Sequence, residues 1–135
     1  MAAEYLNPST LSAPPGAMYS QAVRVSAGET LYISGQVARD QAGNLVGQGD
    51  VLAQYRQVWK NIGFALAAVG LTHDHLVKTT TYVVGEANSA PIRALRKELA
   101  PAKAPTSTML VVPALAIPGA LVEIEAVAFF PDKKK

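Results

Sequence analysis

The sequence predicts an α+β domain built as a two-layer sandwich, with two helices packed on one face of a β-sheet. The chain has 135 residues, a common length for one domain with one hydrophobic core. Five segments have the alternation or the β-branched and aromatic residues that are typical of strands. In two other segments apolar side chains recur every three or four residues, as in helices. The expected order of elements is therefore β-β-α-β-α-β-β.

The first part of the chain predicts a pair of strands. Residues 1–18 are rich in Pro, Ala, Ser and Gly and are expected to form an irregular N-terminal segment before a single domain at residues 19–130. Alternating patterns predict strands at residues 19–26 and 30–37. The Ala-Gly-Glu sequence between them is typical of a turn, so we expect the two strands to form a hairpin.

The clearest expectation is a helix that begins at residue 51. Asp50 is a suitable N-cap, because its carboxylate accepts hydrogen bonds from the free N–H groups of the first turn. Gly70 is well placed to end the helix. Six apolar residues form a stripe along one helix face: Tyr55, Val58, Trp59, Ile62, Leu66 and Val69.

The second half of the chain predicts three strands and one helix. β-Branched and aromatic residues at positions 76–84 favour a strand. A shorter helix is expected at residues 89–99, with Pro91 in its first turn. Two further runs predict strands at residues 107–112 and 121–129. Since two helices cover only one sheet face, the other face is expected to have no helix over it.

Composition excludes several classes of site and partner. The chain has no cysteine, which excludes disulfides, thiolate zinc sites and a cysteine nucleophile and fits a reducing, cytoplasmic compartment. No apolar run reaches the roughly 18 residues of a membrane span, so we expect no membrane partner. The net charge is +2, but three of the 12 basic residues are lysines of a basic tail at residues 131–135. Without these lysines the charge is −1, so no nucleic-acid partner is expected.

The last strand predicts a homo-oligomer. The side that suits packing under the helices carries Val122, Ile124, Ala126 and Ala128. The other side mixes large apolar residues with two carboxylates: Leu121, Glu123, Glu125, Val127 and Phe129. Only 16% of the residues are charged, against about 25% in an average protein, so this side is expected to meet another subunit. A closed cyclic ring is the ordinary way to build such an assembly.

That placement leaves two interpretations of Glu123 and Glu125 open. An unpaired charge buried at an interface is costly. Each carboxylate therefore either forms an ion pair between subunits, or holds a water or a substrate proton in an intersubunit cleft.

Other motifs are weak. His73 and His75 lie two residues apart, which permits a metal site. However, no third ligand is close in sequence and a polar turn is the simpler interpretation, so no metal is expected. The glycines of residues 43–49 lack the Lys and Ser/Thr of a phosphate loop, and no cofactor is expected. Trp59 lies on the apolar stripe and is expected in the core.

Two short segments offer groups that suit a ligand. Gly35 permits close approach to the backbone, whereas its neighbour Ser34 has no adjacent base and is not expected to be a nucleophile. Thr106, Ser107 and Thr108 carry hydroxyl and N–H groups that suit a small anion, although the start of a strand is the simpler interpretation.

Five segments in this order resemble the RidA/YjgF family, also labelled L-PSP endoribonuclease. They are YSQA at 19–22, ISGQ at 33–36, QYRQVWKN at 54–61, VKTT at 77–80 and VEIEA at 122–126. The resemblance implies a chorismate-mutase-like fold and a homotrimer with small-molecule clefts between subunits. Family members with known activity are deaminases, which hydrolyse 2-imino or 2-enamino acids to 2-oxo acids and ammonia.

The resemblance also implies roles for single residues. Carried over by position, Tyr19, Ser34 and Gly35 belong to the substrate-binding cleft, and Glu123 is the catalytic residue that holds the attacking water. Protonated imines are electrophilic at carbon, so the protein mainly has to place a water and balance charge.

The chain departs from the family where the substrate is anchored. Archetypal deaminases have an arginine just before the position of Ser107, and this chain has Thr106 there. A hydroxyl cannot replace a bidentate guanidinium, and losing such an anchor costs about 2–5 kcal/mol. The family's cleft asparagine is also absent, with Arg93 near that position. Arg93 or the amides of residues 106–108 are therefore candidates for binding a different anion.

These departures leave the function open between three classes. The leading interpretation is a deaminase of a small imine or enamine metabolite, with activity on 2-iminobutanoate and 2-iminopropanoate as the question to test. The main alternative is a non-catalytic trimer that binds a small molecule or acts as a chaperone. An endoribonuclease is least favoured, because the chain lacks separated acid and base groups beside a basic surface.

Overall fold

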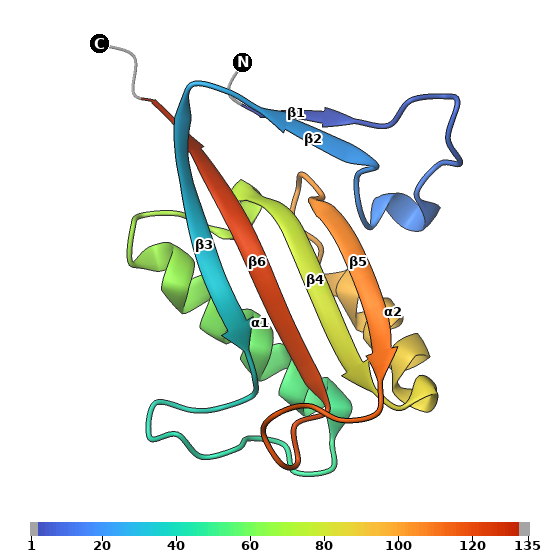
Figure 1. The fold of residues 1–135 in the computed structure, drawn as a ribbon, viewed down its shortest axis with the longest axis vertical. Helices are drawn as coiled ribbons and strands as arrows, with labels where there is room; N and C mark the ends of the chain where they lie inside the picture. Colours follow the sequence, from blue (N-terminus) through green and yellow to red (C-terminus); the bar gives the residue numbers. More distant parts are fainter. Residues whose placement is uncertain (1–2, 133–135) are drawn as a thin grey trace.

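The computed structural model describes residues 3–132 of the chain. Its main sheet has four strands in the spatial order β3-β6-β4-β5, formed by Gly28–Gln36, Val122–Pro131, Leu76–Val84 and Thr106–Val112. β6 is antiparallel to both of its neighbours, whereas β4 and β5 are parallel and joined through a helix. Helices α1 (Val51–Ala67) and α2 (Ser89–Leu99) both lie behind the sheet in Figure 1. We call the uncovered side the open face.

The N-terminal region differs from the expectation in two ways. β1 (Ala3–Leu6) lies within the segment expected to be irregular, and it pairs with β2 (Ala22–Val25) in a separate two-stranded sheet. β2 therefore forms no hairpin ladder with β3, which pairs with β6 instead. The strand β1 was missed because four residues are too few to show an alternating pattern. The pairing was wrong because alternation within a strand does not indicate which strand lies beside it.

Three short 3₁₀ helices complete the described elements: Pro15–Ala17, His73–His75 and Glu86–Asn88. Residues 133–135, the lysines of the expected basic tail, lie outside the described residues. Within the described range, no helix combines the length and apolarity needed to cross a bilayer.

The core lies between α1 and the covered sheet face. Asp50 caps α1 as expected, because its Oδ1 accepts a hydrogen bond of 3.0 Å from the backbone N of Ala53. Four members of the expected stripe are buried: Tyr55, Val58, Ile62 and Leu66. Trp59 is partly buried and packs against this core.

The C-terminal end of α1 is shorter than the apolar stripe. The backbone N of Leu71 donates to the carbonyl of Leu66 at 3.0 Å, and Gly70 makes this turn possible with a φ of 77°. Val69 lies beyond the last helical residue and is 46% exposed. Its expected place in the buried stripe is therefore wrong.

β6 alternates as the sequence predicts, with one exception. Val122, Ile124, Ala126 and Ala128 are buried under the helices. Phe129 was expected on the side left open, but it is only 5% exposed. A Cβ on Gly28 would lie 2.4 Å from Cζ of Phe129, so the ring packs directly on the start of β3. The protomer itself covers Phe129.

Candidate functional site

The open face brings together Glu123 and Gly35, two residues that the sequence singles out. Gly35 is the second-last residue of β3 and lies within a register irregularity between Ile33 and Gln36. A Cβ at Gly35 would lie 2.0 Å from Oε2 of Glu123, so only glycine leaves room for the carboxylate there. The close approach expected at Gly35 is made by a side chain of the same protomer.

The carboxylate of Glu123 is free to bind. It lies in a depression of about 260 Å³ lined by Gly35, Tyr82, Leu115, Glu123 and Glu125. Within the described part of the chain it accepts no hydrogen bond and forms no ion pair. A half-buried carboxylate of this kind can hold a water through its lone pairs.

Glu125 differs from Glu123 because it already has a partner. The hydroxyl of Tyr82 donates to Oε1 of Glu125 at 2.7 Å. This hydrogen bond raises the pKa of Tyr82, with burial and the charges of Glu125 and Glu123 adding to the effect. The pair therefore ties Glu125 to Tyr82, whereas Glu123 accepts no hydrogen bond within the described part of the chain.

A second depression on the open face continues from the first. It has a volume of about 300 Å³ and shares Glu125 with it. Its lining includes Ser34, which the sequence assigned to substrate binding, and Lys78, which it did not. Lys78 is exposed and forms no ion pair with another described residue. It is thus a cation that faces the same hollow as Ser34.

Three other candidates gather at the start of β5. Ser20 binds the carbonyls of Pro105 and Ala104 through its backbone N at 2.9 Å and its hydroxyl at 2.6 Å, which holds the neighbouring Tyr19 at this end of the strand. Thr106 is in register with Lys78 of β4, and Thr108 lies two residues further along. The hydroxyl of Thr106 donates to the carbonyl of Val77 at 3.0 Å.

The residues around Glu123 and the candidates at the start of β5 lie far apart within one protomer. Thr106 is in register with Lys78, and Lys78 with Val127 of β6, four residues from Glu123. At about 3.3 Å per residue and 4.8 Å per strand, the Cα atoms of Thr106 and Glu123 are roughly 16 Å apart. This distance exceeds the length of a four-carbon imino acid.

Ser107 and Arg93 lie on the other side of the sheet. Ser107 faces the helices, where its Oγ accepts a 2.6 Å hydrogen bond from Nη2 of Arg96. Arg93 is exposed on α2, which covers that same side. The arginine that reaches the start of β5 is therefore Arg96, which the sequence analysis did not single out.

The two histidines serve local structure. The ring of His73 stacks on Trp59 with 4.4 Å between centroids, and its Nε2 lies 2.9 Å from the carbonyl of Trp59. Nδ1 of His75 accepts from the backbone N of Thr72 at 3.1 Å. In residues 3–132 no group of three or more His, Cys, Asp and Glu side chains is arranged to hold a metal ion.

Comparisons with known proteins cover nearly the whole chain. The family described as Endoribonuclease L-PSP matches residues 10–130. The chain is 36% identical over 121 residues to 2-iminobutanoate/2-iminopropanoate deaminase of Mus musculus, covering 89% of this chain and 87% of the relative. It is 36% identical over 110 residues to Protein DfrA of Myxococcus xanthus, covering 82% and 83%.

A solved structure agrees with the fold. The Rid protein YyfB from Yersinia pestis, a protein of unknown function, superposes with a TM-score of 0.85 at 38% identity. It covers 96% of this chain and 100% of its own. The α+β fold, with its mixed sheet and two helices on one face, is thus shared with Rid proteins. From residue 10 to residue 130, in sequence and in fold, the chain belongs to the Endoribonuclease L-PSP family, the family of the RidA/YjgF proteins.

Proposed function

We propose that the protein is a hydrolytic deaminase of a small imine or enamine metabolite. The observation that carries the proposal is the free carboxylate of Glu123, held against Gly35 on the open face. The names of several relatives support the reaction class, since they are 2-iminobutanoate/2-iminopropanoate deaminases. The absence of cysteine fits action in the reducing cytoplasm.

Glu123 is proposed to act as a general base toward water. The carboxylate accepts a proton from the water as its oxygen bonds to the iminium carbon, which gives a carbinolamine. Glu123 returns this proton to the nitrogen and the C–N bond breaks. The carboxylate then takes the hydroxyl proton as the carbonyl forms and passes it to the released ammonia. The products are a 2-oxo acid and ammonium, so the reaction needs no group beyond the substrate, one water and the carboxylate.

We propose that the complete cleft forms between copies of the chain in a homotrimer. Glu123 with Ser34 and Gly35 makes one half-site, and Tyr19 with Thr106 and Thr108 makes the other. Because roughly 16 Å separates Thr106 from Glu123 within a protomer, one small substrate does not span both halves there. A cyclic assembly that pairs open faces brings one half-site next to the other.

Lys78 is proposed to supply the charge that Thr106 lacks. It faces the hollow that also contains Ser34, and it is the cation in register with Thr106. An ammonium binds a substrate carboxylate as a point charge without the fork geometry of a guanidinium. The site therefore suits a small monoanionic imine bound less rigidly than in an arginine-containing deaminase.

Ammonia release from freshly generated 2-iminobutanoate tests the proposal. Glu123→Gln is expected to lower kcat by at least about a hundredfold, because the amide cannot accept the proton. The matched control is Glu98→Gln, which removes an exposed carboxylate on α2 and is expected to leave kcat unchanged. Equal activity of Glu123→Gln and wild type would contradict the assignment.

The Thr106→Arg variant distinguishes two functions, a deaminase and a non-catalytic binding protein. The second is favoured by the absence of an arginine at position 106. If the wild type releases ammonia and Glu123→Gln does not, the deaminase stands. If only Thr106→Arg is active, the wild type is a binding protein for this substrate class, and the proposed reaction is wrong.

A further inference from the structure

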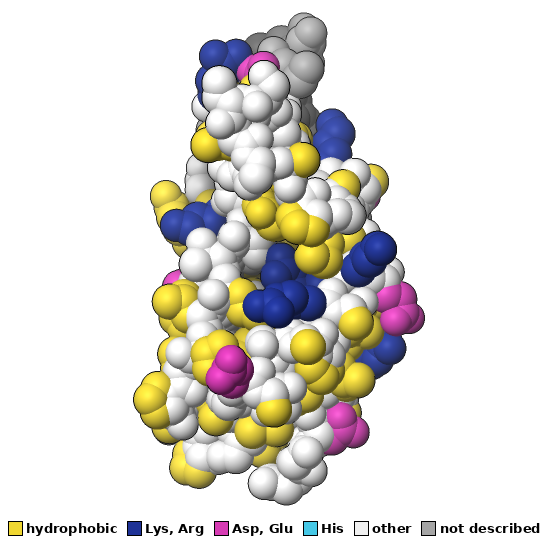
Figure 2. All heavy atoms as spheres, turned by 90° about the vertical axis from the view of Figure 1, so that its right-hand side faces the viewer, with side chains coloured by type: hydrophobic (Ala, Val, Ile, Leu, Met, Phe, Trp, Pro, Cys, Tyr) yellow, Lys and Arg dark blue, Asp and Glu magenta, His cyan; other side chains and the backbone are white. Residues whose placement is uncertain are grey.

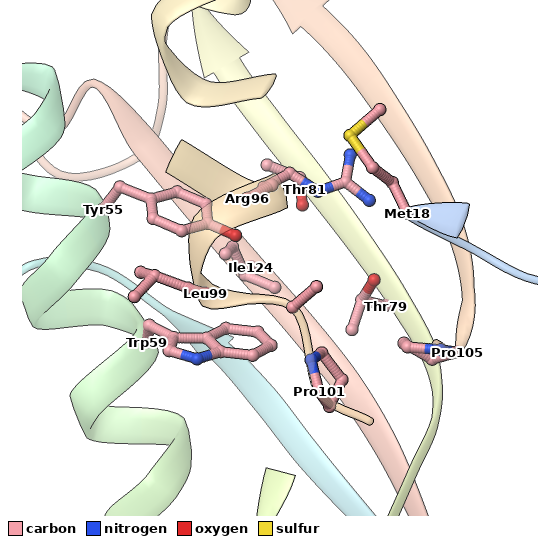
Figure 3. A pocket seen from close by; sticks show the side chains of 11 residues that line it. Met18, Tyr55, Trp59, Thr79, Thr81, Arg96, Leu99, Pro101, Pro105 and Ile124 are labelled. Atoms are coloured by element: carbon pink, nitrogen blue, oxygen red, sulfur yellow. The ribbon is translucent and has the colours of Figure 1, made fainter. Parts of the chain in front are cut away.

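A small cavity lies on the covered side of the sheet, away from Glu123. It sits between α1, α2 and β4, and its lining includes Tyr55, Thr79, Thr81 and Arg96. Figure 3 shows the guanidinium of Arg96 and the hydroxyls of the other three gathered around one space, with Trp59 along its edge. Its volume is about 20 Å³, enough for one water-sized group.

Arg96 brings an uncompensated positive charge to this cavity. A guanidinium has five N–H donors, and the described structure uses one of them, in the hydrogen bond from Nη2 to Ser107. Among the described residues the ion pairs involve only Arg24 with Glu4 and Arg56 with Glu98, so no carboxylate neutralises Arg96. A half-buried cation is costly unless an anion or several acceptors face it.

The surface around the cavity is consistent with this charge. Figure 2 shows the side of the molecule that carries β5 and α2. A group of Lys and Arg side chains lies near its middle, bordered by hydrophobic and uncharged atoms. Asp and Glu side chains lie further out on the same side, so the charge nearest its middle is positive.

Three buried hydroxyls face the same space. Tyr55, Thr79 and Thr81 are 3%, 5% and 2% exposed. Within residues 3–132 none of these hydroxyls makes a hydrogen bond. No fully enclosed side-chain oxygen in the described part lacks a partner, so the three oxygens open onto the cavity. Each hydroxyl carries a proton that it can donate.

Tyr55 stays a donor across the physiological range. Burial raises its pKa to about 12, while the nearby charge of Arg96 works in the opposite direction. The cavity is therefore lined by neutral O–H donors and one cationic donor.

We infer that this cavity is a binding site for one small monovalent anion of the size of chloride. A bound water would satisfy the hydroxyls but leave Arg96 without a counter-charge, and a cation would face the guanidinium. A tetrahedral phosphate is too large for a volume of about 20 Å³. The site is separate from the proposed deaminase cleft, which lies on the opposite face of the sheet.

Trp59 gives this site its own reporter. It is the only tryptophan in the chain and it lines the cavity. The protein is titrated with sodium chloride and, separately, with the larger sodium formate, while sodium methanesulfonate keeps the ionic strength constant. We expect a saturable change in Trp59 fluorescence with chloride. Saturation by formate but not by chloride would overturn a site of this size.

Two variants and one control assign the response to these residues. Arg96→Gln and Thr79→Val are each expected to weaken binding by about tenfold or more, because they remove a charged donor or a hydroxyl. Lys97→Gln removes an exposed charge from the same helix and is expected to bind as the wild type does. Equal affinities in all four proteins, or a response that never saturates, would overturn the site.

Thermal unfolding covers the case in which Arg96→Gln does not fold. A ligand that binds only the native state raises the melting temperature by mass action. Chloride is expected to raise it in the wild type and in Lys97→Gln, and to raise it less in Thr79→Val. An equal rise in Thr79→Val would overturn the site. The measurement contains no imine, so its failure leaves the proposed deaminase untouched.

Discussion

Gly35 and Glu123 show how one backbone position determines where a carboxylate lies. Gly35→Ala places a Cβ 2.0 Å from Oε2 of Glu123. The carboxylate is the far end of a flexible side chain, so it can move away at a cost in stability below about 1 kcal/mol. Its displacement by about 1 Å is expected to lower kcat for imine hydrolysis by about a hundredfold.

A double variant is the control for this prediction. Gly35→Ala is expected to have no additional effect on kcat in the Glu123→Gln background, because the displaced group is already inactive. An active Gly35→Ala, or an equal additional loss in the double variant, would show that Gly35 does not act through Glu123.

The buried hydroxyl of Tyr55 is expected to make the free energy of unfolding depend on pH. Its pKa is raised from 10.0 to about 12 in the folded protein, chiefly by burial. The unfolded state therefore ionises first, and the contribution of Tyr55 is complete below pH 10 and is lost as the pH rises toward 12. The free energy of unfolding of the wild type is expected to fall by about 2 kcal/mol more than that of Tyr55→Phe between pH 9 and pH 12.

Urea unfolding of both proteins at each pH provides the comparison. Other groups titrate equally in the two, so their effects cancel in the difference. A constant difference between wild type and Tyr55→Phe across this range would contradict the buried, protonated hydroxyl.

The sequence identified some of these residues and missed others for physical reasons. Strand alternation alone puts Glu123 on the uncovered side. Lys78 was missed because a register shift between Leu76 and Lys78 turns its side chain to the open face, where simple alternation from Leu76 would bury it. Arg93 and Arg96 are three residues apart on one helix face. Only the packed structure shows that Arg96 contacts Ser107 at the start of β5, whereas Arg93 is exposed.

At the scale of elements, Gln54 ties α1 to two loops. Its side chain is completely buried. Nε2 donates to the carbonyls of Gly47 at 3.1 Å and Gly119 at 3.0 Å, and Oε1 accepts from the backbone N of Leu121 at 2.8 Å. Through these bonds one residue of the helix positions the loop that leads into β6, and with it Glu123.

Gln54→Leu is expected to lower the free energy of unfolding by about 2–4 kcal/mol, because it removes three hydrogen bonds made by a completely buried side chain. The matched control is Gln57→Leu on the same helix. The Gln57 amide bonds Asn61 at 2.8 Å in a more accessible position, so its loss is expected to cost about 1 kcal/mol. Urea unfolding at one protein concentration measures both, and equal losses would contradict the role of Gln54.

The sequence predicted where helices and strands begin more closely than it predicted which strands pair with each other. The N-cap at Asp50 and the proline near the start of α2 are local signals, and both helices begin where the sequence indicates. The pairing of β1 with β2 depends on contacts between segments about twenty residues apart. No local period carries that information, so the structure alone reveals the small N-terminal sheet.

The whole molecule has one sheet face under two helices and one face without cover (Figure 1). On the open face, Tyr32 is 78% exposed and Leu110 is 43% exposed. These apolar side chains surround the carboxylates Glu123 and Glu125. A surface with this composition is typical of a face that meets another protein surface. The proposed homotrimer covers it with copies of the same chain.

Sedimentation equilibrium at micromolar concentration tests most directly whether the open face joins copies of the chain into a shared cleft. The proposed homotrimer gives one species with three times the 14.2 kDa mass of the chain. A species of 14.2 kDa that still hydrolyses the imine would contradict it, because the two half-sites would then never meet.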